Sequence, residues 1–364
     1  MKNKSRRMSE LLSCLSLFFT AGLGSVRIKA LIEHFGTAEA VLSAKLLELR
    51  QVRSLDAASI AGIGAQASRQ RAEAELTRAD KMGLTLLGLT DPCYPESLRA
   101  IYDPPPVLWV RGEVSALKNL TGVLPRSIGV VGTRKASTYA KAFTQKLAHD
   151  LALVGVTVVS GLARGIDTVA HTAAVDAGGS SIAVLGCGVD TIYPSENKAL
   201  SERLTVISAY ALGTPPNSYN FPPRNRIIAG LCSGSVVVEG DTDSGAMITA
   251  VAALEAGREV FAVPGRAGDP LSKGPHKLIK EGATLIESAA DVLENLRWTA
   301  ALPRLAPELE GDEATIYKAL NGEMLLDELC QKTGFITPRA TVALTMLHLK
   351  NMILELPGGR YSKN

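Results

Sequence analysis

Glycine and basic residues that follow a short β-branched run make residues 127–150 the part of this chain best suited to hold a phosphate group. The run from Ile128 to Val131 predicts a buried strand, and the spacing of apolar residues after it predicts a helix. The turn between strand and helix contains Gly132, Thr133, Arg134 and Lys135. A helix N-terminus offers free N–H groups to an anion, glycine lets a ligand approach the backbone, and a guanidinium matches phosphate oxygens. The G-x-x-x-x-G-K-[ST] and G-x-G-x-x-G nucleotide motifs are both absent, so the turn predicts a phosphate without saying which molecule carries it.

A second glycine-rich loop, residues 160–167, follows the next predicted strand and again leads into a helix. Successive N–H groups in such a turn can form a concave anion site. The predicted binding residues of this loop are Ser160, Gly161, Ala163 and Gly165. The Asp167 carboxylate would repel a phosphate, so we expect it to point inward and to accept hydrogen bonds from loop amides. A tight turn that serves packing alone is the alternative.

A proline-stiffened segment, residues 220–226, carries an aromatic ring and further basic groups. Its ring can stack a nucleobase, and its arginines can hold the flanking phosphates. The predicted binding residues here are Phe221, Arg224, Asn225 and Arg226. Because helix positions two apart point in different directions, one of the arginines can instead face inward to a carboxylate such as Glu239. In the alternative interpretation, the ring is a core anchor and both arginines are structural.

The later loops carry weaker signals. Glu239 ends a predicted strand and could be a catalytic base, but the sequence supplies no partner acid or nucleophile. Ser244 suits a helix N-cap. We expect four residues to support the loops: Asp167, Glu239, Ser244 and Gly245. Lys273 and Lys277 can meet a backbone phosphate or form a solvated face. No catalytic residue is predicted, and the spacing of the cysteines and histidines predicts no metal or other cofactor.

The loops require a sheet that brings them together. Short apolar segments alternate with helical segments from residue 127 to about 297, near 128–131, 156–160, 181–185, 204–208, 235–239, 259–263 and 283–286. Such a pattern is typical of a doubly wound α/β fold, an extended Rossmann-like and mostly parallel sheet covered on both faces. Ligands of this fold bind beyond the carboxyl ends of the strands, so the glycine loops should line one crevice.

The flanking segments divide the chain into further domains. We predict an N-terminal helical domain over 1–90, the Rossmann-like domain with its connector over 91–298, a linker over 299–312 and a winged-helix domain over 313–364. The first contains two Gly-x-Gly turns, at 22–24 and 62–64, each followed by basic residues, as in helix–hairpin–helix units that offer N–H groups to a DNA backbone. Alternatively, these glycines only cap helices.

Composition limits the possible partners. The chain has 364 residues and a formal net charge of only +3, so any site for a polyanion must be a local patch. The basic start and the uncharged run from Leu11 to Val26 resemble a signal peptide, but the run is short for a membrane span and continues into a helical pattern. With an odd number of scattered cysteines, we expect a reduced, cytoplasmic protein that does not enter a membrane.

Several motifs together resemble the DNA processing protein A family (DprA, also called Smf). The matching segments are VVGTRKAS (130–137), VVSGLARGIDTVAH (158–171), AVLGCGVDTIYP (183–194), FPPRNRIIAGL (221–231), VVVEGDTDSGAMITA (236–250) and REVFAVPG (258–265). The flanks also fit, because family members often carry an N-terminal helical domain of sterile-alpha-motif or helix–hairpin–helix type and a C-terminal winged helix.

The resemblance implies a non-enzymatic protein that binds single-stranded DNA and loads a RecA-type recombinase onto it, as in natural transformation. It implies Arg134 as a phosphate clamp and Phe221 as the stacking ring. Further implied features are a homodimer formed through the α/β domain, a recombinase contact on that domain, and an encounter with the single-strand binding protein. The chain departs from the family at Ser208-Ala209-Tyr210-Ala211, where Ser-Glu-Tyr-Pro is usual.

Two other functions are compatible with this type of fold. One is an enzyme that acts on a nucleotide or a phosphoribosyl group, but the P-G-G-x-G-T-x-x-E pattern of such relatives is absent. The other is a nucleotide sensor whose winged helix binds duplex DNA. That function calls for a basic recognition helix, whereas residues 337–350 offer only Arg339, His348 and Lys350.

Overall fold

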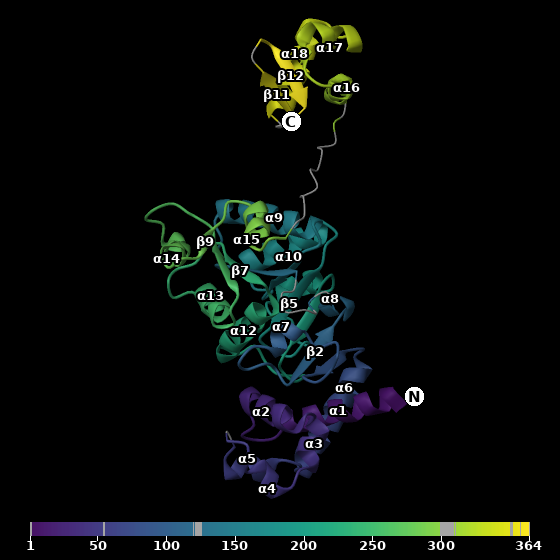
Figure 1. The fold of residues 1–364 in the computed structure, drawn as a ribbon, viewed down its shortest axis with the longest axis vertical. Helices are drawn as coiled ribbons and strands as arrows, with labels where there is room; N and C mark the ends of the chain where they lie inside the picture. Colours follow the sequence, from purple (N-terminus) through teal and green to yellow (C-terminus); the bar gives the residue numbers. More distant parts are fainter. Residues whose placement is uncertain are drawn as a thin grey trace. The chain divides into compact units, whose positions relative to one another are not determined.

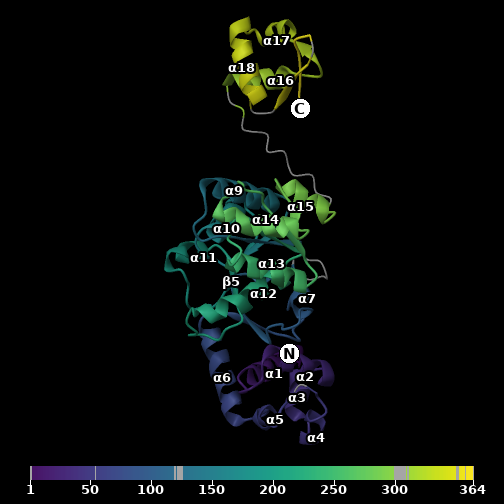
Figure 2. The ribbon, with the colours of Figure 1, turned by 90° about the vertical axis from the view of Figure 1, so that its left-hand side faces the viewer.

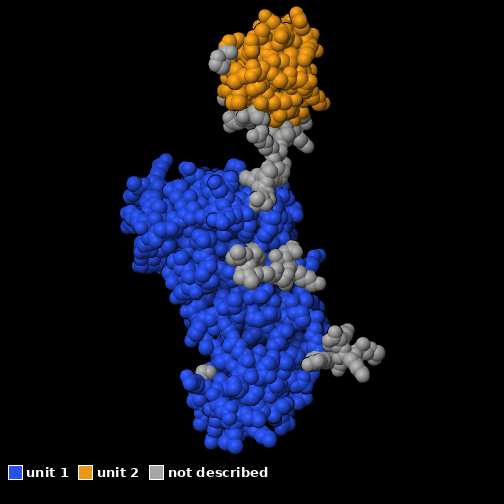
Figure 3. All heavy atoms as spheres, in the orientation of Figure 1, with its two compact units in different colours: residues 1–302 blue, residues 303–364 orange. Residues whose placement is uncertain are grey.

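A computed structural model describes residues 2–53, 55–118, 120, 126–298, 309, 311–349, 352–356 and 358–363. The chain divides into two compact units, residues 1–302 and 303–364 (Figure 3). Of the predicted linker 299–312, only residues 309, 311 and 312 lie within the described residues.

The described part of the first unit contains one sheet of nine strands. The strands are β1 (Thr85–Gly88), β2 (Val107–Arg111), β3 (Ser127–Val131), β4 (Thr157–Ser160), β5 (Ser181–Leu185), β6 (Thr205–Ser208), β7 (Gly234–Val237), β8 (Glu259–Ala262) and β9 (Thr284–Leu285). Their order is β1-β2-β6-β5-β4-β3-β7-β8-β9. Pairing is antiparallel between β1 and β2 and between β2 and β6, and parallel elsewhere. The predicted mostly parallel sheet is confirmed.

Helices cover both faces of this sheet, as the doubly wound prediction requires. On one face α9 (Thr138–Leu153), α10 (Ile166–Asp176) and α15 (Ala289–Asn295) share an apolar core with Ile128 and Val130 of β3. On the other face α7 (Glu96–Arg99), α12 (Phe221–Leu231) and α13 (Gly245–Glu255) pack against Val131 and Val237. Figure 1 shows these two groups of helices on opposite sides of β5 and β7. This part of the chain also contains the helices α8 (Ser115–Lys118), α11 (Lys198–Ser201) and α14 (Lys273–Lys280).

The N-terminal segment is helical, as expected, but it is continuous with the sheet. Its helices are α1 (Lys2–Phe18), α2 (Ser25–Phe35), α3 (Ala38–Ser43), α4 (Leu46–Leu49), α5 (Ala57–Gly62) and α6 (Gln66–Lys81). Figure 2 shows α6 running from these helices toward the sheet. The predicted boundary at residue 90 falls after β1, which is the outer strand of the sheet. The ring of Phe18 lies 5.2 Å from that of the fully buried Trp109 in β2, so one apolar core joins the helices to the strands.

Strands β1 and β2 are absent from the predicted elements. Residues 91–112 are rich in proline and aromatic residues, a composition that predicts a connector. In the structure these prolines end before Val107, and the apolar run V-L-W-V pairs on both sides, with β1 and with β6. Proline excludes a strand only where its missing N–H is needed.

The second unit has the order expected for a winged helix. It contains α16 (Gly311–Ala319), β10 (Met324–Leu325), α17 (Leu326–Thr333), α18 (Thr337–Leu349), β11 (Ile353–Leu356) and β12 (Arg360–Lys363). The described strands form a sheet in the order β10-β12-β11. Fully buried Ile316, Leu329 and Leu347 join the helices in one core. Strands β11 and β12 pair antiparallel, and Pro357 lies outside the described residues.

Within the described ranges, no helix combines the length and apolar character needed to cross a membrane.

Candidate nucleic-acid interface

A cavity of about 390 Å³ lies beyond the carboxyl ends of the central strands and collects most of the predicted binding residues. It is formed by the loops after β3 and β4 and by the N-terminal ends of α12 and α13. Its lining includes the predicted residues Gly132, Thr133, Arg134, Lys135, Ala163, Asp167, Phe221, Arg224, Asn225, Ser244 and Gly245. A second cavity of about 50 Å³ shares Arg134 and Phe221 with it and adds Gly161, Arg164 and Tyr193. The parallel topology therefore brings distant segments to one place, as the sequence predicted.

Glu239 holds the loop after β3 through hydrogen bonds. The carbonyl oxygen of Glu239 accepts a hydrogen bond from the Thr133 amide at 2.7 Å. Its carboxylate accepts from the Ser137 amide at 3.0 Å and from the Ser137 hydroxyl at 2.5 Å. Ser137 also caps α9 by accepting from the Ala140 amide. Glu239 supports the loop, as predicted, and both of its carboxylate oxygens are engaged.

The loops after β3 and β4 interlock. Gly165 has a φ of +77°, and a Cβ there would overlap the carbonyl oxygen of Thr133. The Ile166 amide donates to that same oxygen at 3.3 Å. The Asp167 carboxylate accepts from the amides of Gly161 at 3.1 Å and Ala163 at 3.3 Å, which confirms that it points inward. Gly165 thus acts through loop geometry, because it is not among the residues that line the cavity.

Phe221 lies close to two guanidinium groups. The Cζ atoms of Arg134 and Arg224 are 5.6 and 5.5 Å from the centre of its ring, within the range of a cation–π interaction. The ring is half-buried, and it packs over Gly186, where an added Cβ would lie 2.9 Å from Cδ1. Arg134 is exposed at the mouth of the cavity. The site therefore presents an aromatic ring beside a free cation.

Arg224 has the inward position predicted for one arginine of its segment. Only 5% of it is exposed, and its Nη1 donates to the carbonyl oxygens of Gly161 at 2.5 Å and Val184 at 2.6 Å. Burial lowers the pKa of Arg224 and raises that of Asp167, and the opposite charges of the two side chains limit both effects. The suggested partner carboxylate, Glu239, is instead bound to Ser137. Arg224 therefore forms the floor of the cavity, whereas Arg134 is exposed at its mouth.

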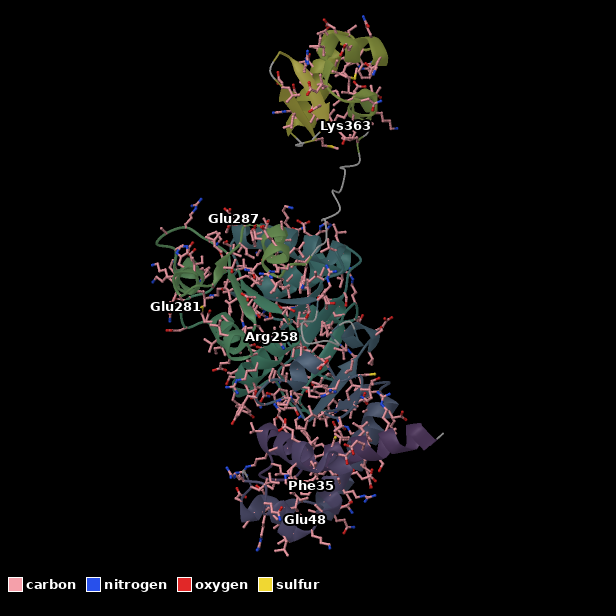
Figure 4. The ribbon with its side chains drawn as sticks, in the orientation of Figure 1. Phe35, Glu48, Arg258, Glu281, Glu287 and Lys363 are labelled. Atoms are coloured by element: carbon pink, nitrogen blue, oxygen red, sulfur yellow. The ribbon has the colours of Figure 1, made fainter. Side chains whose placement is uncertain are left out.

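Besides Gly165, four predicted binding residues line neither cavity. Ser160 is fully buried and donates to the Val130 carbonyl oxygen at 2.6 Å, so its side chain cannot reach a strand of DNA. Arg226, on the far side of α12, pairs with Asp103 at 2.8 Å. Lys273 and Lys277 are exposed on α14, and Lys277 lies 3.9 Å from Glu281, which is labelled in Figure 4. The direction of each side chain depends on its position along the strand or around the helix. The sequence did not show which side of each helix faces the cavity.

The cavity also contains residues that the sequence interpretation missed. Ala246 and Thr249 at the start of α13 line it, as do Val131 and Ile228. Ser244 occupies the predicted N-cap position of α13, yet its buried Oγ makes no capping hydrogen bond. The first N–H groups of α13 therefore face the cavity without a side-chain cap. The S-G-A triplet at the start of α13 was the available signal, because it places a helix N-terminus in the same crevice.

The glycine turns of the N-terminal segment pack against each other. Gly22 has a φ of +80°, and its carbonyl oxygen accepts from Arg27 at 2.8 Å. Arg27 also donates to Ser59 at 2.7 Å and pairs with Asp56 at 2.9 Å. A Cβ on Gly62 would lie 3.0 Å from the Thr20 side chain. These contacts favour the structural interpretation of the turns.

The exposed face of α18 in the second unit is largely uncharged. Val342 and Met346 are 63% and 46% exposed. Arg339 makes a bidentate ion pair with Asp312, at 2.6 and 2.7 Å. Such a face does not offer the free cations of a duplex-reading helix. Among the described residues, no group of His, Cys, Asp or Glu could hold a metal ion.

Comparison with known proteins agrees with this geometry. The family model described as DNA recombination-mediator protein A matches residues 85–297, and the DprA winged helix domain matches residues 300–359. Protein Smf of Escherichia coli (strain K12) is 39% identical over 316 residues, which cover 80% of each chain.

Two solved structures are similar to this chain. The DNA processing protein A of Streptococcus pneumoniae has a TM-score of 0.65 and 35% identity over 77% of this chain and 95% of that one. The DNA processing protein A of Helicobacter pylori, whose structure is described by its single-stranded DNA binding mode, has a TM-score of 0.52 and 27% identity over 59% of this chain and 95% of that one.

Proposed function

We propose that this chain, which belongs to the DNA recombination-mediator protein A family, binds single-stranded DNA in the cavity beyond β3, β4 and β7. One observation carries the proposal: a half-buried ring, Phe221, stands beside an exposed guanidinium, Arg134, above two helix N-termini. A ring that can stack a base and groups that can hold phosphates are the two requirements of sequence-tolerant binding to a single strand.

Each part of the strand has a place in this arrangement. The phosphates bind Arg134, Lys135 and the N–H groups at the start of α13. A base stacks on Phe221, and the buried Arg224 keeps positive charge near it. Duplex DNA binds less well, because its bases are already stacked and paired and cannot reach the ring.

We further propose that the chain acts without catalysis. The one candidate base, Glu239, uses both carboxylate oxygens to hold Ser137. A general base needs a free oxygen within reach of a substrate proton. The cavity thus supplies binding groups and leaves no side chain in position for a nucleotide-processing reaction.

A partner protein would then bind the same DNA strand. We propose that the chain loads a RecA-type recombinase, in competition with the single-strand binding protein, and that it works in the cytoplasm as a homodimer formed through the α/β part. The exposed apolar side chains Ile248, Val251 and Leu254 on α13 support an interface there, since a contiguous apolar patch commonly marks a protein contact.

The binding proposal is tested by gel shifts with labelled single- and double-stranded oligonucleotides. Arg134→Ala should weaken binding of the single strand at least tenfold and reduce its dependence on salt, because fewer counterions are released. Arg27→Ala is the matched control, since this arginine is bound within the N-terminal segment. Equal affinity of the wild type for both forms of DNA, or no loss in Arg134→Ala, would contradict the proposal.

A further inference from the structure

The loop after β6 connects the N-terminal helices to the proposed stacking ring. We define the β6 loop as residues 209–214. Glu75 of α6 lies against this loop and is only 5% exposed. The Oε1 atom of Glu75 accepts from the Leu212 amide at 2.7 Å and from Trp109 Nε1 at 2.9 Å. A carboxylate of the helical segment is therefore bonded directly to the backbone of the β6 loop.

Two further side chains hold the same stretch of loop. Arg78, one turn after Glu75, donates to the Leu212 carbonyl oxygen at 3.3 Å. The Asp190 carboxylate accepts from the Gly213 amide at 2.9 and 3.0 Å, and it lies 3.7 Å from Arg78. Both backbone groups of Leu212 are thus bound to α6.

The other end of the β6 loop reaches Phe221. The Tyr210 hydroxyl donates to the Asn220 carbonyl oxygen at 3.0 Å. Asn220 is buried and donates from Nδ2 to the Gly186 carbonyl oxygen at 2.9 Å. Asn220 precedes Phe221, whose ring packs over Gly186. Tyr210 and Asn220 therefore set both the backbone before the ring and the surface beneath it.

We infer that Glu75 and Tyr210 are positioning residues for the proposed DNA site, through which the N-terminal helices orient Phe221 without touching the strand. The inference rests on the proposed function. Glu75 lies before residue 85, where the family match begins, so the matched domain does not contain this contact.

A buried carboxylate needs a physical reason. Its desolvation is costly unless hydrogen bonds compensate for it, and here the donors are a loop amide and an indole. A bond to Leu212 orders the loop, and an ordered ring loses less entropy when it stacks on a base. The contact consequently affects binding through the orientation of the ring.

The test uses the full-length protein and a single-stranded oligothymidine that contains one 2-aminopurine. Its fluorescence is quenched when the base stacks, and its anisotropy gives Kd over a range of salt concentrations. Tyr210→Phe removes one hydroxyl and keeps the ring of that tyrosine. We expect this variant and Glu75→Ala each to weaken binding about threefold to tenfold, the range of one hydrogen bond. Quenching should fall, and the salt dependence should stay as in the wild type.

Three comparisons separate positioning from a general loss of stability. Glu75→Gln keeps an oxygen that accepts both hydrogen bonds and should restore quenching. Glu73→Gln makes the same change on the exposed side of α6 and should behave as the wild type. In the Tyr210→Phe background, Glu75→Ala should add little further loss, because both residues act through one chain of contacts.

The inference is overturned if the wild type binds and quenches the probe while Tyr210→Phe and Glu75→Ala do so equally well. It is also overturned if the two losses are additive, since Glu75 would then act elsewhere. A wild type that does not bind the strand would instead refute the proposed function, and the inference with it.

Discussion

Arg134 and Arg224 lie at almost the same distance from the ring of Phe221, but burial separates their roles. Arg134 is exposed and free to meet a ligand, whereas Arg224 is bonded to the backbone carbonyls of Gly161 and Val184. The sequence predicted that one arginine of the 220–226 segment could face inward. It could not say which one, because the rotation of α12 depends on what the helix packs against.

The first prediction concerns the buried arginine. Arg224→Ala leaves two carbonyl oxygens without donors and Asp167 without a compensating charge, so we expect the free energy of unfolding to fall by about 3 kcal/mol or more. Urea unfolding followed by circular dichroism measures this change. Arg134→Ala is the control and should lie within about 0.5 kcal/mol of the wild type. Equal stability of both variants would show that Arg224 is not a structural cation.

The second prediction concerns His171 in α10, which is fully buried. Its Nδ1 pairs with Ser181 Oγ at 2.7 Å, while Nε2 has no hydrogen-bond partner. Burial lowers the pKa of His171 to about 3, and the charge of Arg224 acts in the same direction. The unfolded chain then binds more protons than the folded chain below about pH 6.5, so stability is lost as the pH falls toward 3.

Unfolding experiments between pH 7 and pH 4.5 check this expectation. Relative to His171→Gln, the wild type should lose stability with a slope approaching about 1.4 kcal/mol per pH unit below pH 6. Identical slopes for the two proteins would mean that His171 takes up its proton in the folded state.

The helices and strands explain how the two glycine loops reach one another. The β3 and β4 strands were predicted almost to the residue, and their parallel pairing aligns their carboxyl ends. The interlock at Gly165 is a finer feature. It arises because Gly165, in the loop after β4, lies so close to the carbonyl oxygen of Thr133 that there is no room for a Cβ.

The third prediction tests this interlock. Gly165→Ala must separate the loops as well as strain a positive φ, so we expect a loss of more than 2 kcal/mol in stability and at least tenfold in single-strand affinity. Gly155 is the matched control. It has a φ of +75° and no neighbour within 4 Å of an added Cβ, so Gly155→Ala carries the strain alone, about 1 kcal/mol, with affinity unchanged. Similar behaviour of the two variants would remove the loop contact from the site.

As a whole molecule, the chain comprises two compact units with different surfaces. The unit of residues 1–302 carries the cavity and the exposed apolar side of α13. The unit of residues 303–364 presents the largely uncharged face of α18, whose Arg339 is paired with Asp312. The proposed DNA and dimer contacts therefore belong to the first unit.

The fourth prediction follows from this division. A chain ending at residue 302 should fold, bind single-stranded DNA within about twofold of the full-length Kd, and remain a dimer. Fluorescence anisotropy and sedimentation velocity measure the two properties. A truncated chain that is monomeric, or that has lost most of its affinity, would assign part of the binding or assembly to the winged helix.

Local pattern determined much of this protein from sequence alone. Apolar runs of strand length separated by helical periods specify a parallel sheet, and a parallel sheet aligns its loops at one edge. The meeting of the Gly132–Arg134 turn and the 160–167 loop in one crevice followed from that rule, whereas the resemblance implied Phe221 as the stacking ring. The resemblance to the family came from the same motifs, and the comparisons confirm it.

Only the tertiary structure decided which side chains face the cavity and which hold it in place. Ser160 and Arg224 are buried, Arg226 turns to Asp103, and Glu75 reaches the β6 loop from another part of the chain. The physical reason is that burial and hydrogen-bond partners depend on how complete elements pack, and packing joins residues far apart in sequence. Sequence motifs located the turn that we propose to bind phosphate, and long-range packing left Arg134 as the exposed arginine beside the ring.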